Sequence, residues 1–252
     1  MAVSKNQNAL TDCIVEVVLS FPIILNFFST TSGIAVFFSC LFSSPLTLRT
    51  YVPQKCIYPT EYEGHFDSLV LTSTEIQNSV KSIAERIHTD YEGSRPMMLC
   101  VLKGATPFYQ HLLDAMQDLR HGYETEFIRC SSYEGTDSTG RVKVGGGVEF
   151  ERLTGKDVII VEDIVDTGTT LSQLIPILHE KCQPKSIEVV SLLSKRLDEP
   201  PKYVAKYVGF SIPNHFIVGY GLDYNELYRD TKDIFIISQA GIDFDKSTLQ
   251  SK

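Results

Sequence analysis

The chain has no tryptophan and lacks the motifs of several common types of site. None of its six cysteines belongs to a Cys-x-x-Cys pair and there is no His-Glu-x-x-His, which excludes zinc and redox-motif sites of those kinds. The loops Gly-x-x-x-x-Gly-Lys-[Ser/Thr] and Gly-x-Gly-x-x-Gly are also missing, which excludes a Walker A nucleotide site and a dinucleotide fingerprint. Scattered cysteines with apolar neighbours are typical of a reducing compartment.

Positive charge is scarce as well. Lys and Arg number 23 against 31 Asp and Glu, so the formal net charge is −8. Residues 1–51 hold two charges of each sign, so the whole excess falls on residues 52–252. An acidic domain argues against a nucleic-acid surface and therefore against an RNA-binding role. It leaves room for phosphate ligands, which backbone N–H groups and single Lys or Arg residues bind locally.

The N-terminal region has no charged residue between Glu16 and Arg49. Residues 17–48 are long enough to span a membrane, but Pro22, Pro45 and many Ser and Thr interrupt them. Three interpretations stay open: an incorrectly predicted first exon, a membrane anchor or targeting leader, and a cleaved signal peptide. We expect residues 1–51 to be an apolar leader, with membrane association only through residues 17–48, and residues 52–252 to form one domain.

Apolar runs alternate with helical patterns in the rest of the chain. Strands are predicted at residues 97–102, 125–130, 158–161, 187–193, 207–210 and 234–237. Helices are predicted from an N-cap at Thr72 or Ser73, over residues 107–120, and after Thr169. The alternation predicts an α/β fold with a mainly parallel, doubly wound sheet and a small hood from the terminal segments. Ligands then bind at the carboxyl ends of the strands.

Residues 158–171 carry the strongest functional pattern. Four β-branched apolar residues are followed by Glu162 and Asp163, then by the small, hydroxyl-rich run 166–170, and then by a helix. Backbone N–H groups of such a loop and the helix N-terminus bind phosphate. The hydroxyls of its threonines add donors, and the two acids suit ribose hydroxyls or a nearby Mg²⁺. The pattern predicts a site for a phosphorylated sugar.

The run Val-Glu-Asp-Ile-Val-Asp-Thr-Gly-Thr-Thr resembles the phosphoribosyl pyrophosphate (PRPP) signature of type I phosphoribosyltransferases. Four more segments, from about residue 52 to the C-terminus, resemble hypoxanthine-guanine phosphoribosyltransferases in order and spacing: 102–104, 131–140, 194–196 and 216–230. The resemblance implies purine salvage by a pentosyltransferase that turns hypoxanthine or guanine and PRPP into IMP or GMP and pyrophosphate. It also implies Mg²⁺ as cofactor, a cytoplasmic location and a homodimer or homotetramer.

The same resemblance assigns roles to residues at the PRPP end. Asp166 is the expected catalytic base, which accepts the proton at purine N7. The 5′-phosphate is expected to bind to Asp166, Thr167, Gly168, Thr169 and Thr170. Ribose hydroxyls and Mg²⁺ are expected at Glu162 and Asp163, with Asp223 as a further metal ligand. Animal members often have Lys at the positions of Thr169 and Ser131, so this chain has fewer charges at both places.

The other roles concern the purine and the leaving group. Lys195 is expected to donate to the purine O6, which favours hypoxanthine and guanine over adenine. Phe216 is expected to stack on the base, while the backbone of Ile217 and Asp223 contacts its other edge. The resemblance assigns pyrophosphate binding to Lys103, Gly104 and Arg229, with a cis Leu102–Lys103 peptide, and the mobile loop to Ser132 and Tyr133.

Other interpretations of these residues are available. Asp166 is also a suitable helix cap, Lys195 could be a solvent-exposed lysine at a strand end, and His215 is expected to serve packing or surface. Competing functions are xanthine as an additional substrate, a catalytically silent PRPP-binding regulator and a membrane-anchored scaffold. The presence of both Asp166 and Arg229 counts against the silent regulator.

Overall fold

The computed structural model describes residues 14–17, 46–47, 56–132, 142–145 and 148–244. Most of the apolar segment 17–48 lies outside these ranges, as does Tyr133 of the predicted mobile loop. Within the described ranges, no helix is both long and apolar enough to cross a membrane. The predicted boundary between residues 51 and 52 also falls outside them and stays a prediction.

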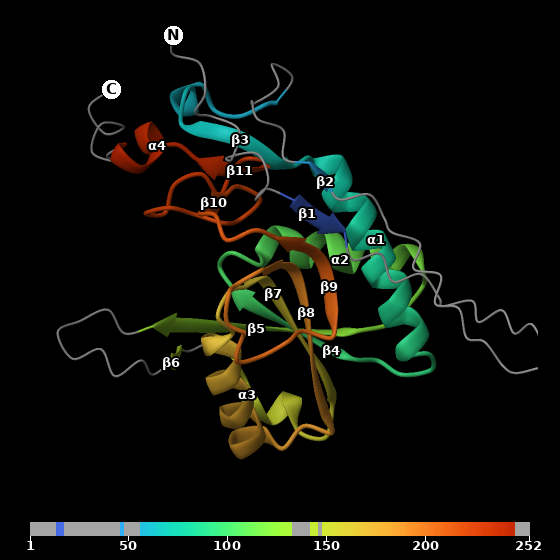
Figure 1. The fold of residues 1–252 in the computed structure, drawn as a ribbon. Helices are drawn as coiled ribbons and strands as arrows, with labels where there is room; N and C mark the ends of the chain where they lie inside the picture. The colour runs from blue at the N-terminus through green and yellow to red at the C-terminus, as the bar shows by residue number, and fades with distance from the viewer. Residues whose placement is uncertain (1–13, 18–45, 48–55, 133–141, 146–147, 245–252) are drawn as a thin grey trace, which may run out of the picture.

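A central sheet organises the fold (Figure 1), with strand order β2-β1-β9-β8-β7-β4-β5-β6. Its strands are β1 (Ile14–Val17), β2 (Leu46–Thr47), β4 (Met97–Leu102), β5 (Glu124–Ser132), β6 (Val142–Gly145), β7 (Asp157–Val165), β8 (Ser186–Lys195) and β9 (Tyr207–Ile212). Strands β9, β8, β7, β4 and β5 are parallel to their neighbours in this series, and the additions at both edges are antiparallel. The predicted mainly parallel α/β sheet is confirmed.

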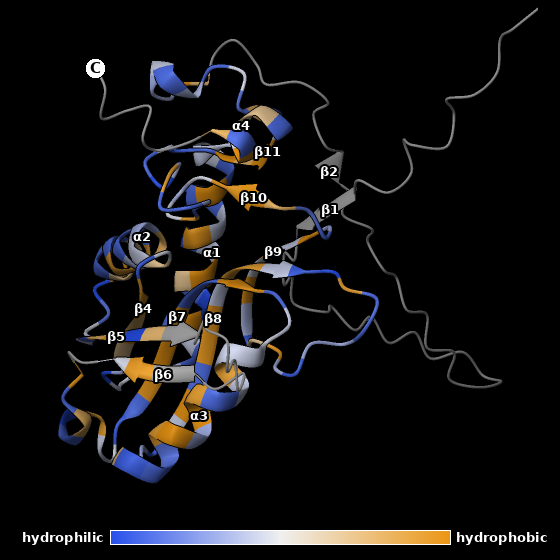
Figure 2. Ribbon diagram, turned by 90° about the vertical axis from the view of Figure 1, so that its left-hand side faces the viewer, coloured by the Kyte–Doolittle hydropathy of each residue, from blue (hydrophilic) through white to orange (hydrophobic). Residues whose placement is uncertain are grey.

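Helices cover both faces of this sheet. On one face α1 (Ser73–Asp90) and α2 (Thr106–Asp118) share a core with the strands. On the other face α3 (Thr169–Cys182) packs with the short 3-10 helix η2 (Phe150–Leu153) in a second core. Strand β8 lies between the two layers and contributes buried residues to both cores, and Figure 2 shows the hydrophobic colour in this strand as well as in the elements that cover it. Burial on both faces explains the continuous apolar sequence of β4, Met-Met-Leu-Cys-Val-Leu, whose first five residues are buried.

Helix α1 begins as its sequence predicts. The Thr72 hydroxyl accepts a hydrogen bond from the backbone N–H of Glu75 at 3.2 Å, and the Glu75 carboxylate accepts one from the N–H of Thr72 at 2.8 Å. This capping box satisfies two N–H groups at the helix start, so Thr72 rather than Ser73 is the N-cap. The helix buries the apolar residues at helical spacing, Ile76, Val80, Ile83, Ala84 and Ile87.

Strand β7 is longer than the predicted run 158–161. Its ladder with β8 continues to the pair Val165 and Ser194, so Glu162 and Asp163 lie within the strand rather than after it. The prediction was wrong here because the backbone pairing of a parallel strand does not require apolar side chains. Successive residues of a strand point to opposite faces, so the two acids are separated by the sheet.

The mobile loop predicted at Ser132 and Tyr133 lies in a polar stretch, residues 131–147, and part of this stretch is strand. Ser131 and Ser132 end β5, and β6 pairs with them antiparallel, with Ser132 opposite Val142. The alternation Val-Lys-Val-Gly in β6 has the two-residue period of a strand, which the glycines of the stretch obscured. Ser132 therefore stands in a β-arm, which projects beside the sheet in Figure 1.

A small second sheet forms the predicted hood. Its order is β10-β11-β3, with strands β10 (Ile217–Val218), β11 (Ile234–Ile237) and β3 (Phe66–Leu71). The 3-10 helix η1 (Thr60–Tyr62) and α4 (Gln239–Asp243) complete it. Tyr228 is fully buried in its core, and its hydroxyl donates to the carbonyl of Gly241 at 2.9 Å. The hood thus joins both terminal segments, although β3 itself was not predicted.

Candidate active site

The loop at residues 166–168 connects β7 to α3, and the predicted run 166–170 continues into the first turn of this helix. Gly168 is the N-cap of α3 and has φ +70°, in the left-handed region. A Cβ at Gly168 would lie 2.6 Å from the backbone nitrogen of Tyr203, and the N–H of Lys202 donates to the carbonyl of Thr167 at 2.8 Å. The loop is therefore held against residues 202–203, and only glycine fits there. No side chain caps the helix, so its first N–H groups are available to an anion.

Asp166 forms an ion pair with Lys195. The carboxylate and ammonium are 2.9 Å apart, and the side chains are 48% and 12% exposed, respectively. Lys195 ends β8, and Asp166 follows β7, the neighbouring strand. The low exposure of Lys195 contradicts the alternative of a solvent-exposed lysine. The contact of Asp166 with Lys195, and the absence of a side-chain cap on α3, likewise contradict the helix-cap alternative.

A hollow of about 250 Å³ opens beside this ion pair. Its lining residues are Asp163, Ile164, Asp166, Lys195, Phe216, Ile217, Leu222 and Asp223. Every residue predicted to bind the purine is in this set. Phe216 is 52% exposed and meets Tyr224 edge-on, with ring centroids 5.4 Å apart. A planar ligand could therefore lie against the exposed ring of Phe216 while Lys195 contacts its polar edge.

The two acids of β7 occupy different surroundings. Asp163 lines the hollow, whereas Glu162 is buried and is not among the lining residues. Burial raises the pKa of both carboxyl groups, and the Asp163 charge raises the pKa of Glu162 further. Hydrogen bonds from backbone N–H groups and the nearby Arg229 act against the rise at Asp163. A site with raised carboxyl pKa values favours a cationic or hydroxyl-bearing ligand.

Glycines bring the backbone close to Asp163. A Cβ on Gly104 would collide with the Asp163 carboxylate, and a Cβ on Gly221 would collide with the carbonyl of Gly104. Gly221 also has φ +96°. Three segments distant in sequence therefore meet at one point because two of them have no side chain there. The Leu102–Lys103 peptide beside this point is cis, as the resemblance implied.

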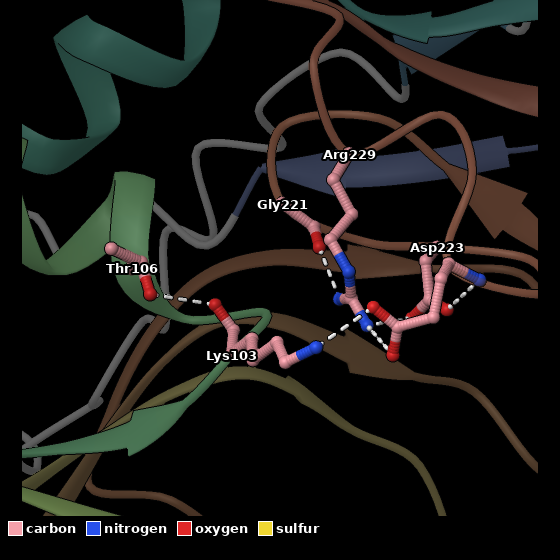
Figure 3. A network of polar contacts seen from close by, with 6 residues as sticks. Lys103, Thr106, Gly221, Asp223 and Arg229 are labelled. Carbon is pink, nitrogen blue, oxygen red and sulfur yellow. Dashed lines mark hydrogen bonds and ion pairs between the residues drawn. The ribbon is translucent and has the colours of Figure 1, made fainter.

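The predicted pyrophosphate-binding cations lie next to these glycines (Figure 3). Arg229 donates to the Gly221 carbonyl at 2.7 Å and contacts the Asp223 carboxylate at 2.7 Å. Lys103 contacts Glu226 at 2.9 Å, and Glu226 contacts Arg229 at 3.2 Å. The structure thus brings Lys103, Gly104, Asp223 and Arg229 together at one end of the hollow. Glu226 had no predicted role, although its position three residues before Arg229 was a usable signal.

The acidic residues of the hollow, Asp163 and Asp223, are its possible ligands for Mg²⁺. Within the described ranges, no three His, Cys, Asp or Glu side chains form a group that could hold a metal. Mg²⁺ usually takes only one or two carboxylates and completes its shell with water and substrate phosphates. Asp163 and Asp223 are close enough for the charge of Asp223 to raise the pKa of Asp163. Such a pair fits an ion that arrives with a phosphorylated substrate.

Known proteins are similar to this chain in sequence and in fold. A sequence model of the family described as "Phosphoribosyl transferase domain" matches residues 70–225. Human hypoxanthine-guanine phosphoribosyltransferase is 38% identical over 192 residues, which cover 74% of this chain and 87% of that protein. Hypoxanthine phosphoribosyltransferase of Staphylococcus aureus is 34% identical with a TM-score of 0.65, covering 72% of this chain and 97% of that one. The Trypanosoma cruzi enzyme, solved as a mutant in a ternary substrates complex, is 36% identical with a TM-score of 0.64 and covers 70% and 98%.

A mainly parallel sheet, a glycine-containing loop before α3, a hood and two cations beside the hollow are together the architecture of a phosphoribosyltransferase. The chain belongs to that family, because the family model matches more than half of it. Within the family it groups with the hypoxanthine-guanine phosphoribosyltransferases, which the 38% identity over most of both chains shows.

Proposed function

We propose that this enzyme transfers the 5-phosphoribosyl group of PRPP to hypoxanthine or guanine in purine salvage, giving IMP or GMP and pyrophosphate. The observation that carries the proposal is the convergence of Lys195, Asp166 and Phe216 on one hollow that adjoins the phosphate loop. A 6-oxopurine has an oxygen acceptor for Lys195 and a flat face for Phe216. Adenine presents a donor where Lys195 needs an acceptor.

Residue roles follow from this placement. Asp166 accepts the proton that the purine loses as its nitrogen bonds to C1 of the ribose and the C1–oxygen bond to pyrophosphate breaks. The N–H groups and hydroxyls of residues 167–170 bind the 5′-phosphate. Lys103 and Arg229 neutralise the departing pyrophosphate. In the ligand-free site the Lys195 ammonium donates to the Asp166 carboxylate. When Lys195 donates to the purine O6 instead, the carboxylate becomes free to accept the proton of the purine.

Mg²⁺ is the proposed cofactor. Asp163 and Asp223, which line the hollow, are the carboxylates that would hold it, whereas Glu162, the third predicted ligand, is buried and is not among the lining residues. When bound, the ion supplies positive charge to the pyrophosphate as negative charge grows there. The position of Asp163 in the hollow supports this assignment, and burial raises the pKa of its carboxyl group, so that a cation beside it would favour the ionised form.

Assembly and location complete the proposal. We expect a homodimer or homotetramer and a cytoplasmic location, where PRPP is made. Light scattering of the purified chain tests the first, and subcellular fractionation tests the second. Recovery of the chain in the membrane fraction would favour anchoring through residues 17–48.

The full chain should be assayed with PRPP, Mg²⁺ and each of hypoxanthine, guanine, xanthine and adenine, with nucleotide formation followed by absorbance. We expect IMP and GMP to form, adenine to be refused, and Asp166→Asn to slow turnover about a hundredfold or more. Asp118→Asn makes the same charge change on an exposed residue of α2 and should leave the rate unaltered. Binding of PRPP without turnover of any purine would favour the silent regulator instead.

A further inference from the structure

Glu226 lies between the two cations that the proposed function assigns to pyrophosphate. One of its carboxylate oxygens is 2.9 Å from the Lys103 ammonium, and the other is 3.2 Å from the Arg229 guanidinium. Figure 3 shows Lys103 and Arg229 directed toward a common region from separate segments. A single carboxylate thus joins the two cations as a phosphate group would, with oxygen acceptors at matching distances.

The backbone around Glu226 holds the carboxylate in this place. Asn225 and Glu226 have φ of +52° and +64°, in the left-handed region that non-glycine residues seldom adopt. The N–H of Glu226 donates to the Asp223 carboxylate at 2.8 Å, which secures the turn. This hydrogen bond therefore stabilises the left-handed conformation of the turn that carries Glu226.

Asp223 and Glu226 differ in how easily they can leave Arg229. The Asp223 side chain is 28% exposed, forms an ion pair with Arg229 and accepts a hydrogen bond from the Glu226 N–H, whereas the Glu226 side chain is 50% exposed. Among the hydrogen bonds and ion pairs of the described residues, the Glu226 carboxylate takes part only in those with Lys103 and Arg229. It can therefore rotate into solvent while the turn and the Asp223–Arg229 pair persist.

We propose that Glu226 is an internal competitor for the pyrophosphate subsite: it occupies Lys103 and Arg229 in the free enzyme and is displaced by the diphosphate group of PRPP or by pyrophosphate. This inference rests on the proposed function, which supplies the ligand. Its consequence is weaker binding of the diphosphate group than the two cations alone would give, which eases release of pyrophosphate after transfer. Glu226 is a residue that sets affinity rather than a catalytic residue.

The test is Glu226→Gln in the full chain, with inorganic pyrophosphate and Mg²⁺ as the probe and calorimetry as the measurement. The amide keeps the size of the side chain but loses the charge that competes with the ligand. We expect the dissociation constant of pyrophosphate to fall about three- to tenfold, since exposed ion pairs are individually weak. The dissociation constant of GMP, which has no diphosphate, should not change.

Glu92→Gln is the matched control, because it removes the same charge from an exposed turn after α1 and should leave pyrophosphate binding as it is. Unchanged or weaker pyrophosphate binding by Glu226→Gln would overturn the inference, because a residue that only positions Lys103 and Arg229 would weaken binding when altered. If that variant does not fold, Glu226→Asp replaces it. Its carboxylate is one methylene shorter and cannot join both cations, so binding should tighten about twofold, and no tightening counts against the inference.

The two proposals fail in different ways. If the wild-type chain neither turns over PRPP nor binds pyrophosphate, the proposed function is wrong. If the wild-type chain does both and Glu226→Gln binds pyrophosphate no more tightly, only the role of Glu226 is wrong.

Discussion

The ammonium of Lys195 lies 2.9 Å from the carboxylate of Asp166, although the two residues are 29 positions apart in the chain. They meet because β7 and β8 are adjacent parallel strands whose carboxyl ends reach the same edge of the sheet. The pair joins the proposed purine contact to the proposed catalytic base. A change at either residue should therefore affect the other.

Lys195→Met removes the donor to the purine O6 and leaves Asp166 without its cation. We expect kcat/KM for hypoxanthine and guanine to fall about a hundredfold, as for loss of a charged hydrogen bond, and preference over adenine to shrink. Initial rates with each purine at saturating PRPP measure both effects. Lys81→Met, an exposed position on α1, is the control. Intact discrimination against adenine would show that Lys195 does not select the base.

Gly104→Ala places a Cβ where the Asp163 carboxylate now lies. Asp163 must move, so we expect turnover to fall by about two orders of magnitude or more, with a loss of about 1–3 kcal/mol in the free energy of unfolding. Urea titration and steady-state rates separate the two losses. Gly122→Ala is the control, because the three atoms nearest to its new Cβ all belong to the flexible side chain of Arg95, the first of them at 3.2 Å. Full activity of Gly104→Ala would mean that the position of Asp163 is not needed for the reaction.

Thr169→Val deletes a hydroxyl at the first turn of α3, where Thr169 lies 3.0 Å from the Thr167 hydroxyl. If this hydroxyl binds the 5′-phosphate, the dissociation constants of PRPP and GMP should both rise about five- to tenfold, for roughly 1 kcal/mol. Titration calorimetry measures both constants. Thr154→Val makes the same change on an exposed residue after η2 and should have no effect. An equal effect of both variants would argue against a phosphate contact at Thr169.

Tyr207→Phe tests a contact that supports the fold away from the site. The Tyr207 hydroxyl donates to the Asp90 carboxylate at 2.7 Å. This hydrogen bond is the largest cause that lowers the pKa of Asp90 from its ordinary value of 3.8, and the Lys206 ammonium lowers it further. Because the folded-state pKa is the lower one, this carboxylate contributes stability above about pH 4 that is lost as pH falls through the folded-state pKa.

Tyr207→Phe should therefore lower the free energy of unfolding at pH 7 by about 1 kcal/mol, or Tm by roughly 2–4 °C. The difference from the wild-type chain should narrow at pH 3, because acid below the ordinary pKa of 3.8 progressively protonates Asp90 and removes its stabilising contribution. Thermal unfolding at the two pH values provides the comparison. A difference that is the same at pH 3 and pH 7 would assign the loss to packing of the ring instead.

Much of the fold follows from local pattern. The capping box at Thr72, the apolar stripe of α1 and the strand at residues 97–102 were all predictable, because caps and periodicity act over a few residues. The extension of β7 through Glu162 and Asp163 was not, because pairing with β8 holds polar residues in a strand. The β-arm formed by β5 and β6 was missed for a similar reason, since its pairing overrides the glycine content.

The candidate site divides in the same way. The sequence by itself determined the kinds of group present: a hydroxyl-rich loop with a glycine at its turn, acids beside it, and a lysine at the end of the next strand. Only the tertiary structure decided their contacts, which bury Glu162, expose Asp163 to the hollow and place Glu226 between Lys103 and Arg229. The physical reason is range: loop and strand preferences are local, whereas contacts between residues more than a hundred positions apart depend on how the sheet and hood close together.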